Sequence, residues 1–243
     1  MEKKKIAAVV LAAGQGKRMG TETAKQYLML DGKPVLYYAL QAFEESEADI
    51  VVLVTGKDEI EYCKKEIVDM FGFEKVKVVV AGGKERYHSV ACGLQALKDM
   101  QMETEVVLIH DGARPFVTPT MISKLIAETK EKEACVIGTP VKDTIKIADD
   151  EGYCSQTPAR NRVWAVQTPQ SFAYNLVSSA YEKLLADEQK LLEQGVQITD
   201  DAMVVEYMTD KKVYLVEGDY TNIKLTTPED LVISEAFLKN VKK

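Results

Sequence analysis

The sequence predicts an α/β protein with a doubly wound, mostly parallel sheet of the Rossmann-like kind. Apolar runs rich in Val and Ile alternate with amphipathic patterns along much of the 243 residues. Such alternation favours parallel strands covered by helices on both faces. A basic, glycine-rich loop follows the first apolar run, which is where sheets of this class bind ligands.

The periodicity of the chain predicts the first elements in order. Five apolar runs are expected to form buried strands, at residues 6–11, 50–55, 76–81, 105–110 and 134–139. Four helical patterns lie between them, at residues 34–45, 58–71, 87–100 and 118–132. In the second pattern, Ile60, Cys63 and Ile67 fall at the three-to-four spacing of one apolar helix face. Pro34 and Pro119 suit the first turns of their helices.

The alternation stops between Pro140 and Pro169. Residues 141–147 and 153–166 have extended patterns on either side of the turn signal 149–152. We therefore expect residues 140–169 to form a β-hairpin arm that projects from the core. Because an isolated hairpin is only marginally stable, packing against a second subunit is one interpretation, and a surface ornament is the other.

The remaining chain returns to the α/β pattern. It predicts a helix over 171–192, a polar loop over 197–201, a strand over 212–217 and a last helix after Thr227. Thr227 is a good N-cap, and the acidic residues that follow it suit a first helical turn. Since no linker, repeat or low-complexity tract interrupts the sequence, we predict a single domain over residues 1–243.

Composition narrows the class of partner. The formal net charge is −7, which argues against nucleic acid or an anionic membrane as the main partner. The four cysteines are scattered, which indicates reduced thiols. The basic and apolar N-terminus imitates an export signal, but a first strand and its loop explain the same residues. We expect a cytoplasmic protein with no membrane partner.

The loop after the first strand has the composition of a phosphate site. Gly14 and Gly16 allow close backbone approach, and Lys17, Arg18 and Lys25 add positive charge. The loop lacks the hydroxyl residue of a P-loop, and its glycine spacing is one residue too long for the dinucleotide fingerprint. A nucleotide phosphate site is the functional interpretation, and a purely structural turn is the alternative.

A second candidate site follows the strand that ends near Ile109. Asp111 at the carboxyl end of this strand is well placed to hold magnesium beside substrate phosphates. A turn aspartate paired with Arg114 is the alternative. With only two histidines and no cysteine cluster, the chain is a poor candidate for a zinc enzyme.

Six ordered motifs extend these two sites over essentially the whole chain. They comprise residues 11–19, 25–27, 81–90, 111–115, 167–170 and 222–224. Together they resemble the 2-C-methyl-D-erythritol 4-phosphate cytidylyltransferase family. The resemblance implies transfer of CMP from CTP to methylerythritol phosphate with release of pyrophosphate. It also implies Mg²⁺ or another divalent cation, and a homodimer formed through the 140–169 arm.

The resemblance assigns a role to each matching residue. The nucleotide-binding residues would be Ala12, Ala13, Gly14, Gly16, Gly83, Ser89 and Asp111, and Asp111 would also hold the metal. The catalytic cations would be Arg18, Lys25 and Lys224. The sugar-phosphate contacts would be Arg114, Thr144, Arg160 and Thr168, of which Thr144 and Arg160 would reach the partner subunit's site. Either Asp219 or Thr221 would occupy the position of an acidic sugar-binding residue.

Three other functions compete with this interpretation. Ribitol-5-phosphate cytidylyltransferases share the expected fold and chemistry, but Ala13 and the Gly112-Ala113 pair favour methylerythritol phosphate. A non-catalytic nucleotide sensor should have lost a charged residue, whereas Arg18, Lys25, Asp111 and Lys224 are all present. A Rossmann oxidoreductase would require the dinucleotide fingerprint that the first loop lacks.

Overall fold

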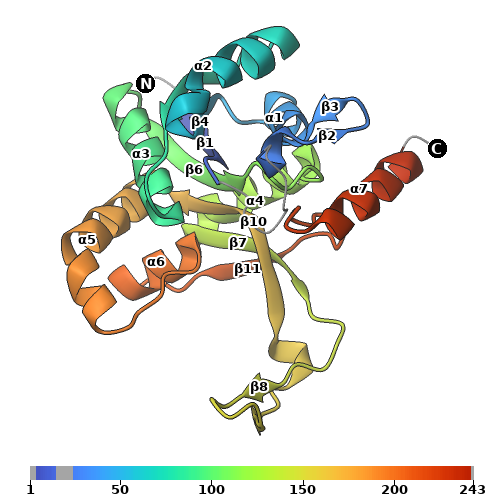
Figure 1. The fold of residues 1–243 in the computed structure, drawn as a ribbon. Helices are drawn as coiled ribbons and strands as arrows, with labels where there is room; N and C mark the ends of the chain where they lie inside the picture. Colours follow the sequence, from blue (N-terminus) through green and yellow to red (C-terminus); the bar gives the residue numbers. More distant parts are fainter. Residues whose placement is uncertain (1–3, 15–23, 242–243) are drawn as a thin grey trace.

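The computed structural model describes residues 4–14 and 24–241, which surround a central seven-stranded sheet (Figure 1). The strand order is β11-β7-β10-β6-β1-β4-β5. The strands are β1 (Lys5–Ala12), β4 (Ile50–Thr55), β5 (Val76–Ala81), β6 (Thr104–Asp111), β7 (Ala134–Pro140), β10 (Trp164–Ala173) and β11 (Tyr214–Glu217). Strand β10 is antiparallel to both neighbours, and the other pairs are parallel. The predicted mostly parallel α/β sheet is confirmed.

Helices cover both faces of this sheet. The helices of the described chain are α1 (Val35–Glu44), α2 (Ile60–Tyr62), α3 (Arg86–Asp99), α4 (Pro119–Lys132), α5 (Tyr174–Glu193), α6 (Asp201–Met208) and α7 (Pro228–Val241). Alternate residues of β1 supply two separate cores, because successive strand side chains point to opposite faces. Ile6, Ala8 and Val10 pack in the core that includes α1 and α4. Ala7 and Val9 pack in the core of α3, α5 and α6.

Two predicted elements differ from the structure, and one helix is additional. The helix expected over 171–192 begins at Tyr174, because residues 171–173 complete β10 and pair with β6 and β7. The expected helix at 58–71 is a 3₁₀ turn, α2 and a π-helical stretch at Cys63–Asp69. Helix α6 was not predicted. Asp200 caps it by accepting a hydrogen bond from the Met203 amide at 2.9 Å.

The segment between β7 and β10 lies away from the main sheet (Figure 1). We call residues 141–163 the projecting segment. Its short strands β8 (Ile147–Ala148) and β9 (Cys154–Gln156) pair antiparallel. Pro140 and residues 164–169, which the predicted arm included, are strands of the main sheet.

Two further features complete the described fold. Strands β2 (Met29–Leu30) and β3 (Lys33–Pro34) form a small antiparallel pair just before α1. Within residues 4–14 and 24–241, no helix is both long enough and apolar enough to cross a bilayer.

Candidate active site

The carboxyl ends of the parallel strands open onto a cavity of about 740 Å³. Strands β1 and β6 are parallel neighbours with Leu11 beside Asp111, so the loops that follow them meet at one edge of the sheet. The cavity is lined by Leu11, Ala13, Gly14, Lys25, Gln26, Gly83, Lys84, Glu85, Arg86, Ser89, Asp111, Ala113 and Lys224. Five separate chain segments therefore contribute to one pocket.

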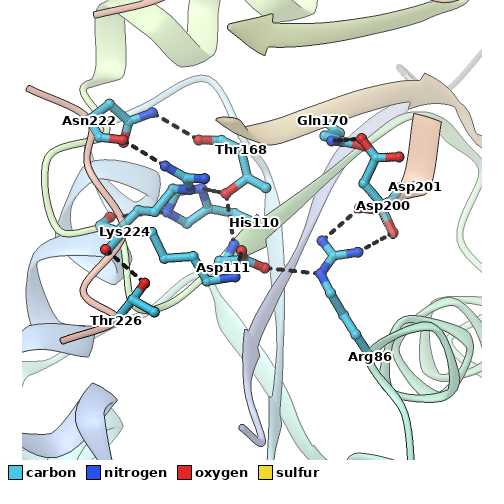
Figure 2. Close-up of polar contacts among 11 residues, drawn as sticks. Arg86, His110, Asp111, Thr168, Gln170, Asp200, Asp201, Asn222, Lys224 and Thr226 are labelled. Atoms are coloured by element: carbon cyan, nitrogen blue, oxygen red, sulfur yellow. Dashed lines mark hydrogen bonds and ion pairs between the residues drawn. The ribbon is translucent and has the colours of Figure 1, made fainter. Parts of the chain in front are cut away.

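Asp111, the last residue of β6, is the central anion of this pocket (Figure 2). Its Oδ2 accepts a hydrogen bond from Lys224 Nζ at 2.6 Å. Its Oδ1 accepts one from Arg86 Nε at 3.2 Å. Burial opposes ionisation of Asp111, but the charges of Arg86 and Lys224 outweigh it and hold its pKa well below the usual range. The carboxylate is therefore fully ionised at neutral pH.

Asp111 is a chemically suitable ligand for a divalent cation. Carboxylate oxygens suit magnesium, which usually takes one or two protein carboxylates and completes its shell with water and phosphate oxygens. Among the described residues, no group of three or more His, Cys, Asp or Glu side chains could hold a metal ion. A cation at Asp111 would thus depend on substrate oxygens for the rest of its coordination.

The loops beside β1 and β5 approach each other closely at two glycines. A Cβ at Gly82 would lie 2.6 Å from both Ala13 Cβ and Ser89 Oγ, and a Cβ at Gly83 would collide with His88. Ser89 Oγ accepts a hydrogen bond from the Gly83 amide at 3.1 Å, which fixes this loop against α3. The two loops therefore need glycine at these positions to pack this closely.

Lys25 also lines the pocket. It begins the short 3₁₀ helix Lys25–Tyr27, and the neighbouring Gln26 is buried and donates a hydrogen bond to the Ala12 carbonyl at 2.5 Å. Gln26 thereby ties the Lys25 turn to the end of β1. Lys25 and Lys224, two of the three predicted catalytic cations, line the same cavity.

A chain of hydrogen bonds supports Asp111 from behind. The Arg114 carbonyl can only accept, so His110 Nε2, 3.2 Å away, carries the proton. His110 Nδ1 is then free to accept from the Thr168 hydroxyl at 3.1 Å, whose oxygen accepts from the Asp111 amide at 3.0 Å. Burial lowers the pKa of His110 to about 4, which keeps the ring neutral. Thr168 is thus buried beside the pocket.

Arg114 belongs to the same group of hydrogen-bonded residues as His110 and Thr168. Its Nη1 donates to the Asn222 carbonyl at 2.8 Å, while its buried Nε has no hydrogen-bond partner within the described chain. Asn222 in turn donates to the Thr168 carbonyl at 3.0 Å. These contacts place Arg114 and Thr168, both predicted to bind the sugar phosphate, next to Asp111, the candidate metal ligand.

The other predicted site residues lie elsewhere or outside the described chain. Thr144 and Arg160 are exposed on the projecting segment and do not line the cavity of their own chain. Gly16 and Arg18 lie outside the described residues. Ala12 is buried at the end of β1, directly before the cavity-lining Ala13.

The acidic position near Asn222 was left open between two residues. Asp219 Oδ1 accepts hydrogen bonds from both the amide and the hydroxyl of Thr221, at 2.7 and 2.8 Å. Both side chains are exposed, and neither lines the cavity. The assignment of the acidic sugar-binding position to either Asp219 or Thr221 therefore stays a prediction.

Two charged residues of the site had no predicted role. Arg86 belongs to a quoted motif, but the spacing of that motif does not reveal the Arg86–Asp111 contact across 25 residues. Asp201 was expected at the end of a polar loop, and it pairs with Arg86 across 115 residues. The Asp200–Asp201 pair before an apolar stretch is a helix-start signal that could have indicated α6.

Comparison with known proteins agrees with this geometry. Residues 6–240 match the family model described as 2-C-methyl-D-erythritol 4-phosphate cytidylyltransferase (IspD). A protein of that name from Lachnoclostridium phytofermentans is 50% identical over 97% of each chain, and one from Clostridium kluyveri is 48% identical, again over 97% of each chain.

A solved structure supports the same relationship. The 4-diphosphocytidyl-2C-methyl-D-erythritol synthase of Anaerococcus prevotii superposes with a TM-score of 0.82 at 36% identity, covering 97% of this chain and 96% of the other. Both the sequence match and the fold thus extend over nearly the whole length. The chain belongs to the 2-C-methyl-D-erythritol 4-phosphate cytidylyltransferase family.

Proposed function

We propose that the cavity at the ends of β1 and β6 transfers CMP from CTP to 2-C-methyl-D-erythritol 4-phosphate, releasing pyrophosphate. The observation that carries this proposal is a single cavity that holds Lys25 together with Arg86 and Lys224, which both contact the ionised Asp111. A site with several cations around one carboxylate suits a reaction between two phosphorylated substrates.

The nucleophile in this reaction needs no general base. A phosphate monoester has its second pKa near about 6, so its oxygen is already largely anionic at neutral pH. It attacks the α-phosphorus of CTP in line while pyrophosphate leaves. The main obstacle is repulsion between two anions, which Lys25 and Lys224 offset by binding the phosphate oxygens in position. We propose Arg18 as a third such cation.

Asp111 would hold the divalent cation in this scheme. When bound, the cation neutralises phosphate charge and stabilises the leaving oxygen. In the described structure Lys224 contacts the same carboxylate, at Oδ2. Lys224 can therefore turn its ammonium group from Asp111 toward a substrate phosphate without leaving the pocket.

The remaining assignments concern the nucleotide and the sugar phosphate. Backbone groups of residues 12–14 and 83, with Ser89, would contact the nucleotide. Arg114 and Thr168 would bind methylerythritol phosphate from the same subunit. Thr144 and Arg160 would complete the partner subunit's site in a homodimer formed through residues 140–169. A reaction between two small phosphorylated metabolites also fits the expected cytoplasmic location.

A competition assay tests this function directly. Pyrophosphate release is measured with CTP and equal concentrations of methylerythritol 4-phosphate and ribitol 5-phosphate. We expect methylerythritol phosphate to be consumed first and to give the higher kcat/KM. Preferred consumption of ribitol phosphate would overturn the substrate assignment, and CTP binding without any turnover would indicate a nucleotide sensor.

A further inference from the structure

Asp201 is a buried charge that the reaction scheme does not use. This first residue of α6 is fully buried, and its carboxylate lies behind Arg86 as seen from Asp111 (Figure 2). Arg86 Nη1 and Nη2 each donate to one Asp201 oxygen at 2.8 Å. The Tyr181 hydroxyl donates to Oδ1 at 2.5 Å. A carboxylate this well paired in the interior has a defined orientation.

The pairing with Asp201 determines how Arg86 can reach Asp111. A guanidinium group is planar, and a two-point contact with a carboxylate fixes its plane. With both Nη atoms on Asp201, the contact that Arg86 makes with Asp111 is through Nε, which donates to Oδ1. The second oxygen, Oδ2, is left to Lys224 at 2.6 Å. Each oxygen of Asp111 thus has a separate partner.

Asp201 is itself held in place by strand β10. Gln170 Oε1 accepts a hydrogen bond from the Ala202 amide at 2.8 Å, and Gln170 Nε2 donates to Asp200 Oδ2 at 2.9 Å. Because β10 pairs directly with β6, the start of α6 is fixed relative to the strand that ends at Asp111. The position of Asp201 is therefore built into the sheet.

We propose that Asp201 is a positioning residue for the divalent cation. By holding both Nη atoms of Arg86, it restricts Arg86 to Oδ1 of Asp111. The other oxygen, Oδ2, then becomes available for the cation when Lys224 turns from it toward a substrate phosphate. Without the Asp201 charge, the guanidinium fork is free to turn and pair with both oxygens of Asp111, in direct competition with the cation. This inference rests on the proposed role of Asp111 as the metal ligand.

The test compares CTP binding with and without a metal. Titration calorimetry measures the dissociation constant of CTP in Mn²⁺ and again in EDTA, and the ratio of the two reports the contribution of the metal. Loss of a residue that orients a metal ligand typically weakens metal affinity about 10- to 100-fold. We expect Asp201→Asn to reduce the ratio by roughly that factor, while binding in EDTA changes little.

An exposed carboxylate of the same helix provides a matched control. Glu206→Gln makes the corresponding chemical change at an exposed position of α6. We expect it to leave the Mn²⁺-to-EDTA ratio at the wild-type value. Tyr181→Phe removes one hydrogen bond to Asp201 and should reduce the ratio roughly threefold to tenfold. If Asp201→Asn does not fold, the ratio measured for Tyr181→Phe tests the proposal in its place.

Asp111→Asn separates this inference from the assignment beneath it. If Asp111→Asn also keeps the wild-type ratio, the metal assignment itself fails. If Asp111→Asn abolishes the metal effect while folded Asp201→Asn and Tyr181→Phe keep it, only the positioning role of Asp201 is overturned.

Discussion

At the scale of single residues, the site is organised by alternating charges. Asp201, Arg86, Asp111 and Lys224 form a row in which each charge contacts one of the opposite sign. Burial strengthens such contacts because little water screens them. The row keeps Asp111 ionised, and it places two cations where a phosphate can bind.

Lys25 carries the clearest prediction for catalysis. We expect Lys25→Ala to keep the fold and to lower kcat by a factor on the order of 10²–10³, by analogy with removal of one positioned oxyanion donor. Lys64→Ala, which changes an exposed lysine paired only with Glu61 among the described contacts, is the control and should retain full activity. Steady-state pyrophosphate release measures both. A normal rate in Lys25→Ala would show that the catalytic centre is misassigned.

His110 should make stability depend on pH in a defined window. Its pKa is about 4 in the native protein, against 6.5 for an ordinary histidine. Above pH 6.5 both states are neutral, so its full contribution is present. As the pH falls from 6.5 to 4, only the unfolded chain binds a proton, and the free energy of unfolding falls by on the order of 3 kcal/mol.

The His110→Gln variant tests this window. We expect its free energy of unfolding, measured by urea denaturation at pH 7 and pH 4.5, to change less than that of the wild type. The stability that Asp111 contributes is also lost in acid, but at lower pH than that of His110. Its depressed native pKa affects the free energy of unfolding only near and below the ordinary carboxyl pKa. An unchanged slope in His110→Gln would contradict the prediction.

At the scale of elements, the ends of β1, β5 and β6 form the site because parallel strands bring their carboxyl ends to one edge. Close approach between the loops after β1 and β5 depends on Gly82. Strand β10, inserted antiparallel between β6 and β7, brings Thr168 and Gln170 to the same region. The site is thus supported by a strand that has no counterpart in a simple doubly wound sheet.

Gly82→Ala should disturb both packing and nucleotide binding. Its new Cβ would lie 2.6 Å from Ala13 Cβ and Ser89 Oγ, so the loops must separate. We expect a destabilisation of about 1–3 kcal/mol and weaker CTP binding. Gly14→Ala is the control for space, since a Cβ there has no neighbour within 4 Å in the described chain. It should keep the wild-type melting temperature, and equal destabilisation of both variants would refute the argument.

At the scale of the whole molecule, a dimer would explain two exposed residues. Thr144 and Arg160 stand on the projecting segment, away from the cavity of their own chain. In the proposed symmetric dimer each segment would extend to the partner's cavity, so each site would combine a pocket from one subunit with side chains from the other.

Co-expression of two inactive variants tests the shared site. A mixed dimer of Lys25→Ala and Arg160→Ala subunits has one intact site, so random pairing should restore about a quarter of the wild-type rate. Lys25→Ala with Lys224→Ala is the control, because both changes damage the pocket and no mixed dimer has an intact site. Pyrophosphate release measures both mixtures. If the mixture of Lys25→Ala and Arg160→Ala recovers no activity, arms that cross between subunits are excluded.

The sequence alone determined the local features of this protein. Apolar periodicity located five strands, and the loops after β1 and β6 were recognisable as candidate ligand sites, because strand burial and glycine or charged residues at strand ends are local properties. Lys25, Lys224 and Asp111 followed from ordered motifs, and the structure places all three in one cavity.

Only the tertiary structure decided the contacts between distant segments. The antiparallel insertion of β10, the existence of α6 and the Arg86–Asp201 pair all depend on packing between residues far apart in the chain. Local propensity carries no information about such partners, since a buried carboxylate and its guanidinium are matched by geometry in three dimensions. The orientation of Asp111 is therefore a property of the fold.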